Sequence, residues 1–200
     1  MAQPSHLSTG MPETQEAKSM KDEIVGIIPQ YGFLNYVDST GTRDSRQLAG
    51  IGIDFNGASY FKNVMKDYYL GISTGFFYSH LGPASANFLG DGPDNTTGGG
   101  ANFLLIPADL KIGYNFTPEF RASVHGGGNV IYRSIANAAI LGAGSDSMDS
   151  SWKLYPDVGA DFEYQAGAYV SLIARPDITI APNSNAFMGT LGLSILLTDL

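Results

Sequence analysis

The sequence has no cysteine, only three histidines and no long apolar run. The lack of cysteine excludes disulfides, thiol catalysis and cysteine-based metal sites. Three histidines scattered along a chain make a poor metal site, so neither a metal nor another cofactor is predicted. The longest uncharged apolar stretch, residues 135–144, is too short to cross a membrane as a helix. A one-domain chain of 200 residues with these absences is either a soluble β protein or a transmembrane β-barrel.

The net charge of the chain restricts the classes of partner it can bind. The chain has 11 basic and 19 acidic residues and a net charge of −8, which argues against nucleic acid as a partner. Hydrophobic residues make up 44% of the chain, which on average is compatible with a soluble protein. A membrane barrel spreads its apolar residues over every second position, so such an average does not reveal it.

Apolar residues occupy alternate positions in eight separate stretches of the sequence. Residues 104–116 show the pattern clearly, with apolar side chains at every even position: Leu104, Ile106, Ala108, Leu110, Ile112, Tyr114 and Phe116. A period of two residues indicates strands. The opposite face carries Gly, Ser, Asn, Asp, Lys and Arg in strand after strand, as in a barrel with lipid outside and a polar lumen. The predicted strands are 27–37, 47–56, 68–80, 101–116, 120–132, 152–164, 168–180 and 186–197.

The connections and the chain ends fit the same architecture. Long polar or glycine-rich segments at 38–46, 81–100 and 133–151 alternate with tight turns near 117–119 and 165–167. Short turns on one side and long loops on the other are typical of bacterial outer-membrane barrels. Residues 1–23 are polar and show no strand pattern, so we expect a periplasmic tail, flexible or with a short helix, before a barrel domain at 24–200.

Aromatic residues gather at both ends of the predicted strands. One set is Phe55, Tyr68, Tyr114, Phe116, Phe120 and Tyr164, and the other is Tyr78, Phe103, Tyr132, Trp152 and Phe187. Amphipathic rings prefer the headgroup level of a bilayer, so the two sets are interpreted as membrane girdles.

The last predicted strand contains a motif that barrels of this kind use as an assembly signal. The pattern is polar-x-Gly-x-x-apolar-x-apolar, and it is met by Thr190, Gly192, Ile195 and Leu197, with leucine in place of the usual final aromatic. From about residue 27 onward, the chain resembles the small eight-stranded bacterial outer-membrane barrels of the OmpA/OmpX type. The resemblance implies an all-β, antiparallel up-and-down transmembrane barrel, surrounded by outer-membrane lipid and inserted with the help of assembly machinery. Such a protein needs a signal peptide in its precursor; none is visible here, and we expect one to have been removed.

Charged residues fall on the inward face of the predicted strands: Asp54, Asp109, Lys111, Arg121, His125, Lys153, Asp157, Asp161, Glu163, Arg175 and Asp177. They indicate either an ion or solute path or a closed lumen held by salt bridges. Eight strands leave little free width, and buried charges tend to be paired, so the closed lumen is favoured. The predicted pairs are Arg121 with Glu163, and Lys111 or His125 with Asp157.

A lipid-modifying enzyme is a third possibility, because some small barrels use a Ser/His pair. Ser79 and His80 are neighbours on a strand and point to opposite faces. Ser123 and His125 share a face but lie about 7 Å apart along the strand, with no evident orienting group. No catalytic residues and no enzymatic activity are predicted.

The lipid face of strands 120–132, 152–164 and 168–180 contains small residues and a proline: Ala122, Gly126, Gly128, Pro156, Ala160 and Ala174. Small residues permit close approach of another protomer, although glycines also ease the curvature of a barrel. The prediction is therefore a closed or very narrow surface barrel that forms a homo-oligomer through these strands. The alternative is a narrow pore or a channel for small hydrophobic solutes.

Overall fold

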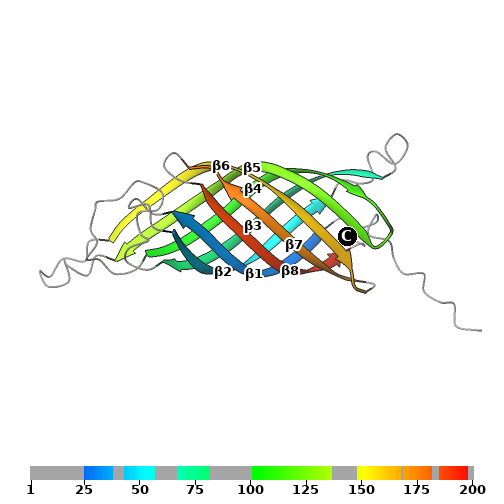
Figure 1. Cartoon of the computed structure of the whole chain (residues 1–200), viewed down its shortest axis with the longest axis horizontal. Coiled ribbons are helices and arrows are strands. Elements are labelled where there is room, and N and C mark those ends of the chain that lie inside the picture. Colours follow the sequence, from blue (N-terminus) through cyan, green and yellow to red (C-terminus); the bar gives the residue numbers. More distant parts are fainter. Residues whose placement is uncertain are drawn as a thin grey trace, which may run out of the picture.

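Eight antiparallel strands close into a barrel in the computed structural model (Figure 1). The structure describes residues 25–37, 43–56, 67–81, 101–136, 148–167, 169–181 and 185–197. The strands are β1 (Val25–Val37), β2 (Arg43–Asn56), β3 (Tyr68–Leu81), β4 (Ala101–Asn115), β5 (Phe120–Ala136), β6 (Met148–Gln165), β7 (Val170–Thr179) and β8 (Ala186–Leu197). Each strand pairs with its neighbour in sequence, and β1 pairs with β8 to complete the circle. The predicted fold class and strand number are confirmed.

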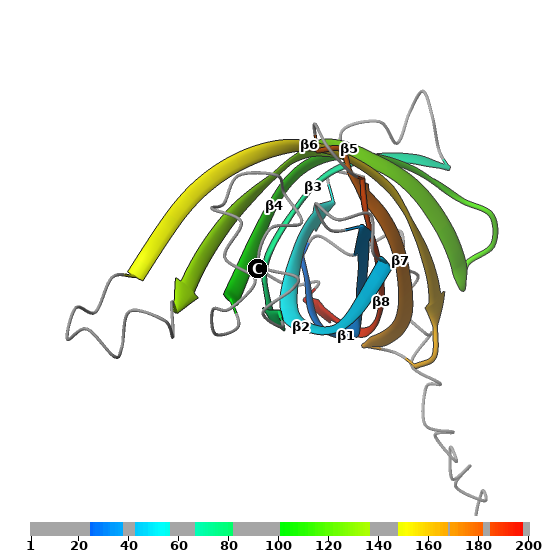
Figure 2. The same cartoon turned by 60° about the vertical axis from the view of Figure 1, so that its left-hand side comes forward.

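Strand pairing extends further than the sequence predicted at one end of the barrel. Residues 43–46, 133–136 and 148–151 were assigned to connections but belong to strands. These polar segments stay paired because the ladder is made by backbone groups, which need no apolar alternation. The extended β5 and β6 project beyond the rest of the barrel (Figure 2). β7 is shorter than predicted, and the predicted tail at 1–23 lies outside the described residues.

The outer wall is apolar over its whole circumference. Leu110 of β4 is 72% exposed, Leu154 of β6 is 69% exposed and Leu191 of β8 is 69% exposed, while most residues between outward positions are buried. A soluble protein rarely exposes a continuous apolar surface of this extent, so the wall is suited to lipid. No helix in the described part of the chain is long and apolar enough to cross a membrane.

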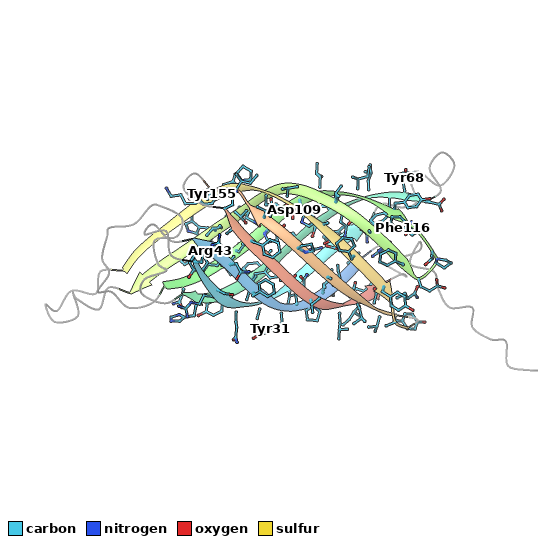
Figure 3. The ribbon with its side chains drawn as sticks, viewed as in Figure 1. Tyr31, Arg43, Tyr68, Asp109, Phe116 and Tyr155 are labelled. Carbon is cyan, nitrogen blue, oxygen red and sulfur yellow. The ribbon has the colours of Figure 1, made fainter. Side chains whose placement is uncertain are left out.

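Aromatic rings line one rim of the barrel, where the tight turns lie. The ring of Tyr114 lies 4.9 Å from that of Tyr68 and 5.0 Å from that of Phe116, centroid to centroid, and Phe120 follows at 5.7 Å from Phe116. Figure 3 shows Tyr68 and Phe116 at this same end. This half of the girdle prediction agrees with the structure.

The other rim differs from the girdle prediction at one residue. The rings of Tyr132 and Trp152 lie 4.7 Å apart on the outside, tilted by 42°, whereas Phe103 is only 1% exposed and points into the lumen. The assignment of Phe103 to the girdle is wrong, because its odd position in β4 faces inward although it lies near a strand end.

Three prolines coincide with interruptions of the ladder. Pairing of β1 with β8 is interrupted at Pro29, that of β3 with β4 at Pro107, and that of β6 with β7 at Pro176. Proline has no N–H to donate to a neighbouring strand. At Pro107, the Thr74 hydroxyl of β3 donates to the proline carbonyl at 2.8 Å, so this carbonyl has a hydrogen-bond donor although the ladder is interrupted.

Replacing Leu110 with arginine tests the orientation of the wall. We expect Leu110→Arg to lower the unfolding free energy by about 2–4 kcal/mol, because the charge enters the hydrocarbon. Glu119→Arg, in the exposed turn between β4 and β5, serves as the matched control, with an expected change of at most about 1 kcal/mol. Urea unfolding in lipid measures both, and equal effects would show that Leu110 does not face the membrane core.

Candidate functional site: the barrel lumen

The centre of the lumen is crossed by four charged side chains from four strands, here called the ion-pair network: Asp54 of β2, Lys111 of β4, Asp161 of β6 and Arg175 of β7. The Lys111 ammonium pairs with Asp54 and lies 3.3 Å from Asp161. The Arg175 guanidinium donates from Nε to Asp161 at 2.5 Å and from Nη2 to both oxygens of Asp54 at 3.2 Å. All four side chains are at most 3% exposed. Each cation thus bridges the same two carboxylates, which neutralises all four charges out of contact with water.

A second ion pair lies nearer the tight turns. Arg121 of β5 donates from Nε to Glu163 of β6 at 2.8 Å, and its Nη2 lies 2.6 Å from the same oxygen. Ser171 donates to the other Glu163 oxygen at 2.5 Å, and the guanidinium lies over the Tyr69 ring at 5.3 Å. The predicted Arg121–Glu163 pair is present in the structure.

The loop side of the lumen is apolar, which the sequence analysis missed. Here an apolar plug fills the interior, formed by Leu34, Tyr36, Leu48, Phe77, Phe103, Leu105, Ile131, Tyr155, Ala181, Ala186 and Met188. The expectation of a polar lumen along the whole barrel is therefore wrong for this part. The available signal was the loss of clear alternation: Leu34 and Tyr36 are apolar on the inward face of β1, and strand 27–37 is apolar on both faces.

A third group of charges lies between the network and the plug. His125 of β5 makes a 2.8 Å contact through Nε2 with Asp177 of β7, while Asp109 of β4 and Asp157 of β6 lie alongside. The Asp109 and Asp157 carboxyl groups lie within hydrogen-bond reach of each other, and no N–H or hydroxyl group of the described residues donates to Asp157. The predicted pairing of Lys111 or His125 with Asp157 is wrong, because Lys111 contacts Asp54 and Asp161 and His125 contacts Asp177.

Lys153 does not belong to the buried charges. It was assigned to the lumen because of its odd position in β6, but its side chain is exposed. Its cross-strand neighbour is Ile131, a plug residue. At Lys153, β6 projects beyond the closed part of the barrel, so a side chain on its inner face is not enclosed by the other strands.

The serine and histidine side chains have other partners. Ser79 donates to the carbonyl of Gln47 at 2.7 Å, and His80 contacts Asn102 at 3.1 Å on the opposite face. Ser123 donates to Asp161 at 3.1 Å, and His125 contacts Asp177. In these contacts each serine hydroxyl is engaged by an acceptor other than a histidine.

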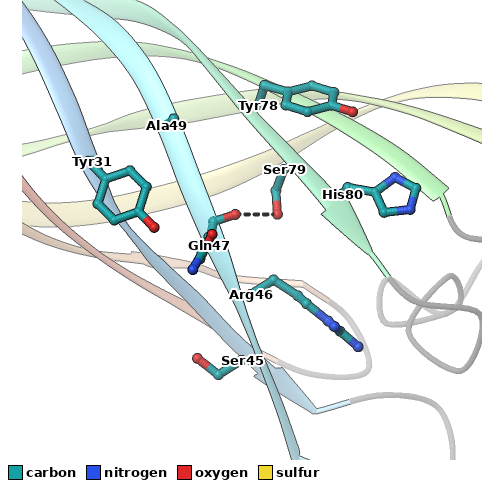
Figure 4. Close-up of a pocket in the computed structure, with 8 residues that line it drawn as sticks. All are labelled: Tyr31, Ser45, Arg46, Gln47, Ala49, Tyr78, Ser79 and His80. Carbon is teal, nitrogen blue, oxygen red and sulfur yellow. Dashed lines mark hydrogen bonds between the residues drawn. The ribbon is translucent and has the colours of Figure 1, made fainter.

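A pocket opens in the outer wall where β2 and β3 separate. The ladder between them ends at the pair Ala49–Tyr78, and the Ser79 hydroxyl bridges the strands beyond it (Figure 4). The pocket has a volume of about 480 Å³ and its lining includes Tyr31, Arg46 and His80. Tyrosine and arginine side chains suit the membrane interface, because each has an apolar body and a polar tip. The sequence analysis did not identify this pocket.

Small and large side chains face each other across the outer wall of β5 and β6. The cross-strand pairs are Ala122 with Phe162, Val124 with Ala160, Gly126 with Val158 and Gly128 with Pro156. Leu154 covers part of Gly128, so this glycine is less open than the sequence suggested. A hollow of about 340 Å³ lies over Ala174, rimmed by Phe162, Tyr164, Leu172 and Leu191.

The proposed assembly signal lies at the seam that closes the barrel. Thr190 donates to Gln30 of β1 at 2.5 Å inside the lumen, and Gly192 pairs with the same residue. Ile195 is 45% exposed on the lipid face, and Leu197 pairs with Val25 at the end of the seam. The residues of the motif therefore alternate between the two faces of β8, with Thr190 in the lumen and Ile195 facing lipid.

Comparison with known proteins supports the fold. No protein-family model and no curated protein sequence matches the chain. Ail, the attachment invasion locus protein of Yersinia pestis, matches with a TM-score of 0.59 at 10% identity, over 88% of this chain and 99% of Ail. Ail in complex with the heparin analogue sucrose octasulfate gives a TM-score of 0.60 at 8% identity and the same coverage. Neisserial surface protein A gives 0.51 at 12% identity, over 86% of this chain and 97% of that protein. The chain thus has the fold of the small outer-membrane barrels, and function has to be argued from its own residues.

Proposed function

We propose that the protein is a bacterial outer-membrane surface barrel whose lumen is closed and whose β5–β7 wall binds a second copy of the chain. The location is supported by the apolar outer wall, the aromatic rim at Tyr68, Tyr114 and Phe116, and the fold shared with outer-membrane proteins. Lipid is then the partner of the wall, and the long loops are displayed at the cell surface.

The ion-pair network is the observation that carries the closed lumen. Its four side chains reach across the interior from β2, β4, β6 and β7 and are at most 3% exposed. An open water-filled pore would solvate these groups instead of pairing them. The apolar plug above the network adds a second obstacle, because an ion would have to shed its water to pass it.

Single-channel recording in planar bilayers tests closure. We expect the wild-type protein to give no steady conductance, under conditions in which an open porin, used as a positive control, conducts. Steady ion conductance by the folded wild-type barrel would contradict the closed lumen and favour the narrow pore. Uptake of small hydrophobic solutes into proteoliposomes without ion conductance would favour a solute channel.

Self-association is supported by the shape of the β5–β7 wall. Alternating small and large residues across β5 and β6 give it ridges and hollows, and the hollow over Ala174 can accept a projecting side chain. Association in lipid depends on such close packing, because lipid itself is as apolar as the wall.

An alanine-to-leucine pair tests this surface. We expect Ala160→Leu on β6 to convert a discrete oligomer into monomer, because the larger side chain prevents close approach. Ala49→Leu places the same change on β2, four strands away around the barrel, and should leave the oligomer intact. Native size and cross-linking in nanodiscs measure both, and a wild-type protein that is purely monomeric would exclude the interface.

A further inference from the structure

The buried charges of the lumen are unevenly matched. Three cations, Lys111, Arg121 and Arg175, pair with three carboxylates, Asp54, Asp161 and Glu163. Three further carboxylates, Asp109, Asp157 and Asp177, are buried to 5% exposure or less. Among the described residues, the ion pair between Asp177 and His125 is the only one that any of these three makes. The excess negative charge is therefore concentrated in one part of the lumen.

Two of these carboxylates and the imidazole have the spacing of metal ligands. One atom each of Asp109, His125 and Asp157, here called the carboxylate–histidine cluster, lie within 4.8 Å of one another. Gly127 of β5 stands directly between Asp109 and Asp157 in the ladders. A Cβ at Gly127 would lie 2.7 Å from an Asp109 oxygen, so the missing side chain leaves the space into which the carboxylate extends.

Gly159, which also lacks a side chain, leaves space for the imidazole ring of His125. The His125 ring lies over Gly159 of β6 and reaches Asp177 on the next strand, and a Cβ at Gly159 would collide with it. The absence of side chains at Gly127 and Gly159 thus leaves the space that Asp109 and His125 occupy. Asp177, at 2.8 Å from Nε2, fixes the orientation of the ring, as carboxylates commonly do for histidine ligands.

Several acceptor atoms around the cluster lack a hydrogen-bond donor although they are buried. Both oxygens of Asp157, one oxygen each of Asp109 and Asp177 and the side-chain oxygen of Asn129 receive no hydrogen bond from an N–H or hydroxyl group of the described residues. Nδ1 of His125 lies 3.7 Å from an oxygen of Asp161. Asn129 is fully buried, and its amide nitrogen donates to Thr179 at 2.7 Å. Thr179 is the cross-strand partner of Asp157, so Asn129 is linked through Thr179 to the strand position opposite Asp157. Unpaired buried acceptors at such density are costly unless a cation satisfies them.

We propose that the lumen binds a divalent cation through oxygens of Asp109 and Asp157 and one imidazole nitrogen of His125. Mixed nitrogen and oxygen ligands suit first-row ions such as Zn²⁺ or Mn²⁺, whereas Ca²⁺ and Mg²⁺ prefer oxygen alone. Asn129 and Asp177 supply further oxygens at the edge of the site. The two positive charges of the ion offset part of the excess negative charge of the three carboxylates.

The position of the cluster determines how the ion enters. The ion-pair network closes the lumen on the turn side, and the apolar plug closes it on the loop side. A cation held between two closed layers exchanges slowly with solvent once the barrel is formed. The ion is therefore expected to bind as the barrel folds, which couples occupancy to stability.

Refolding with and without metal tests the site. Untagged full-length protein is refolded in detergent with EDTA or with ZnCl₂, MnCl₂, MgCl₂ or CaCl₂, washed with EDTA, and analysed by elemental mass spectrometry. We expect one retained Zn²⁺ or Mn²⁺ for each wild-type chain and none in Asp109→Asn/Asp157→Asn. The double variant His6→Gln/His80→Gln removes the other two histidines and should retain the ion.

Thermal unfolding gives a second readout that does not depend on the double variant folding well. The heat-dependent gel shift of the wild-type barrel should occur at higher temperature after refolding with Zn²⁺ than after refolding with EDTA. Asp157→Asn, which keeps the size of the side chain, should unfold at the same temperature under both conditions. His125→Gln should abolish Zn²⁺ retention, since it removes the nitrogen ligand.

Three results would overturn the proposal. The first is folded wild-type protein that retains no Zn²⁺ or Mn²⁺, or no more than Asp109→Asn/Asp157→Asn. The second is retention that depends on His6 or His80, or that is equal for Ca²⁺. The third is a wild-type unfolding temperature unaffected by metal together with a higher one in Asp157→Asn, which would show that the carboxylates share a proton instead.

Discussion

Arg175→Met should destabilise the barrel by about 3–5 kcal/mol, the cost of leaving a buried ion pair without one partner. Arg175 donates to Asp161 and to both oxygens of Asp54, and all three side chains are at most 3% exposed. After the substitution, Lys111 alone faces two carboxylates, so one negative charge stays buried without compensation. Methionine retains much of the apolar volume, which confines the effect mainly to charge. Urea unfolding in nanodiscs, followed by fluorescence of the single tryptophan, Trp152, measures the change.

Two further variants make this prediction specific. Arg43→Met removes an exposed guanidinium from the edge of β2 and should change the unfolding free energy by no more than about 0.5 kcal/mol. Asp161→Asn combined with Arg175→Met should cost less than the sum of the two single changes, because the second removes a charge that the first left unpaired. Strict additivity, or an Arg175→Met barrel as stable as wild type, would mean that the network does not hold the lumen together.

Phe103→Ala should have an effect of similar size for a different reason. The ring is 1% exposed inside the apolar plug, so its removal leaves a cavity among Leu105, Tyr155 and the other plug residues. Truncation of a buried phenylalanine costs about 3–5 kcal/mol, from lost burial and from the cavity itself. The same urea titration in nanodiscs measures it.

Phe116→Ala is the matched control for the plug. Phe116 lies at the turn rim and is 59% exposed, with the rings of Tyr114 and Phe120 beside it. We expect a clearly smaller loss than at Phe103, since no enclosed cavity forms. Equal losses at the two positions would indicate that Phe103 faces the membrane, as its place near a strand end first suggested, and would remove the plug as a barrier in the lumen.

The number of strands and the face of most side chains were predictable from the sequence. Alternation of period two is local information, and it fixed outward positions such as Leu110 and Leu191 and inward ones such as Asp54 and Asp161. The predicted strand bounds and side-chain environments were wrong where they depend on contacts with other strands. Residues 43–46 and 133–136 belong to strands by their backbone pairing, and Lys153 lies where β6 leaves the closed barrel.

The partners inside the lumen were largely beyond the sequence. The Arg121–Glu163 pair was predictable because both residues face inward on adjacent strands and both lie near the tight turns, where they are cross-strand partners. Asp54 and Arg175 are 121 residues apart, and His125 and Asp177 are 52 apart, on strands that are not neighbours in sequence. Which of these charges meet depends on the register of all eight strands and on how far each long side chain reaches across the lumen.

The sequence by itself thus determined an eight-stranded barrel with an apolar wall, aromatic rims and charges inside, because each of these follows from alternation along single strands. Only the tertiary structure decided that the loop side of the lumen is apolar, that β2 and β3 separate around a pocket, and that Asp109, His125 and Asp157 converge. Closure of the barrel sets side chains from distant strands against one another, and no pattern within one strand contains that information.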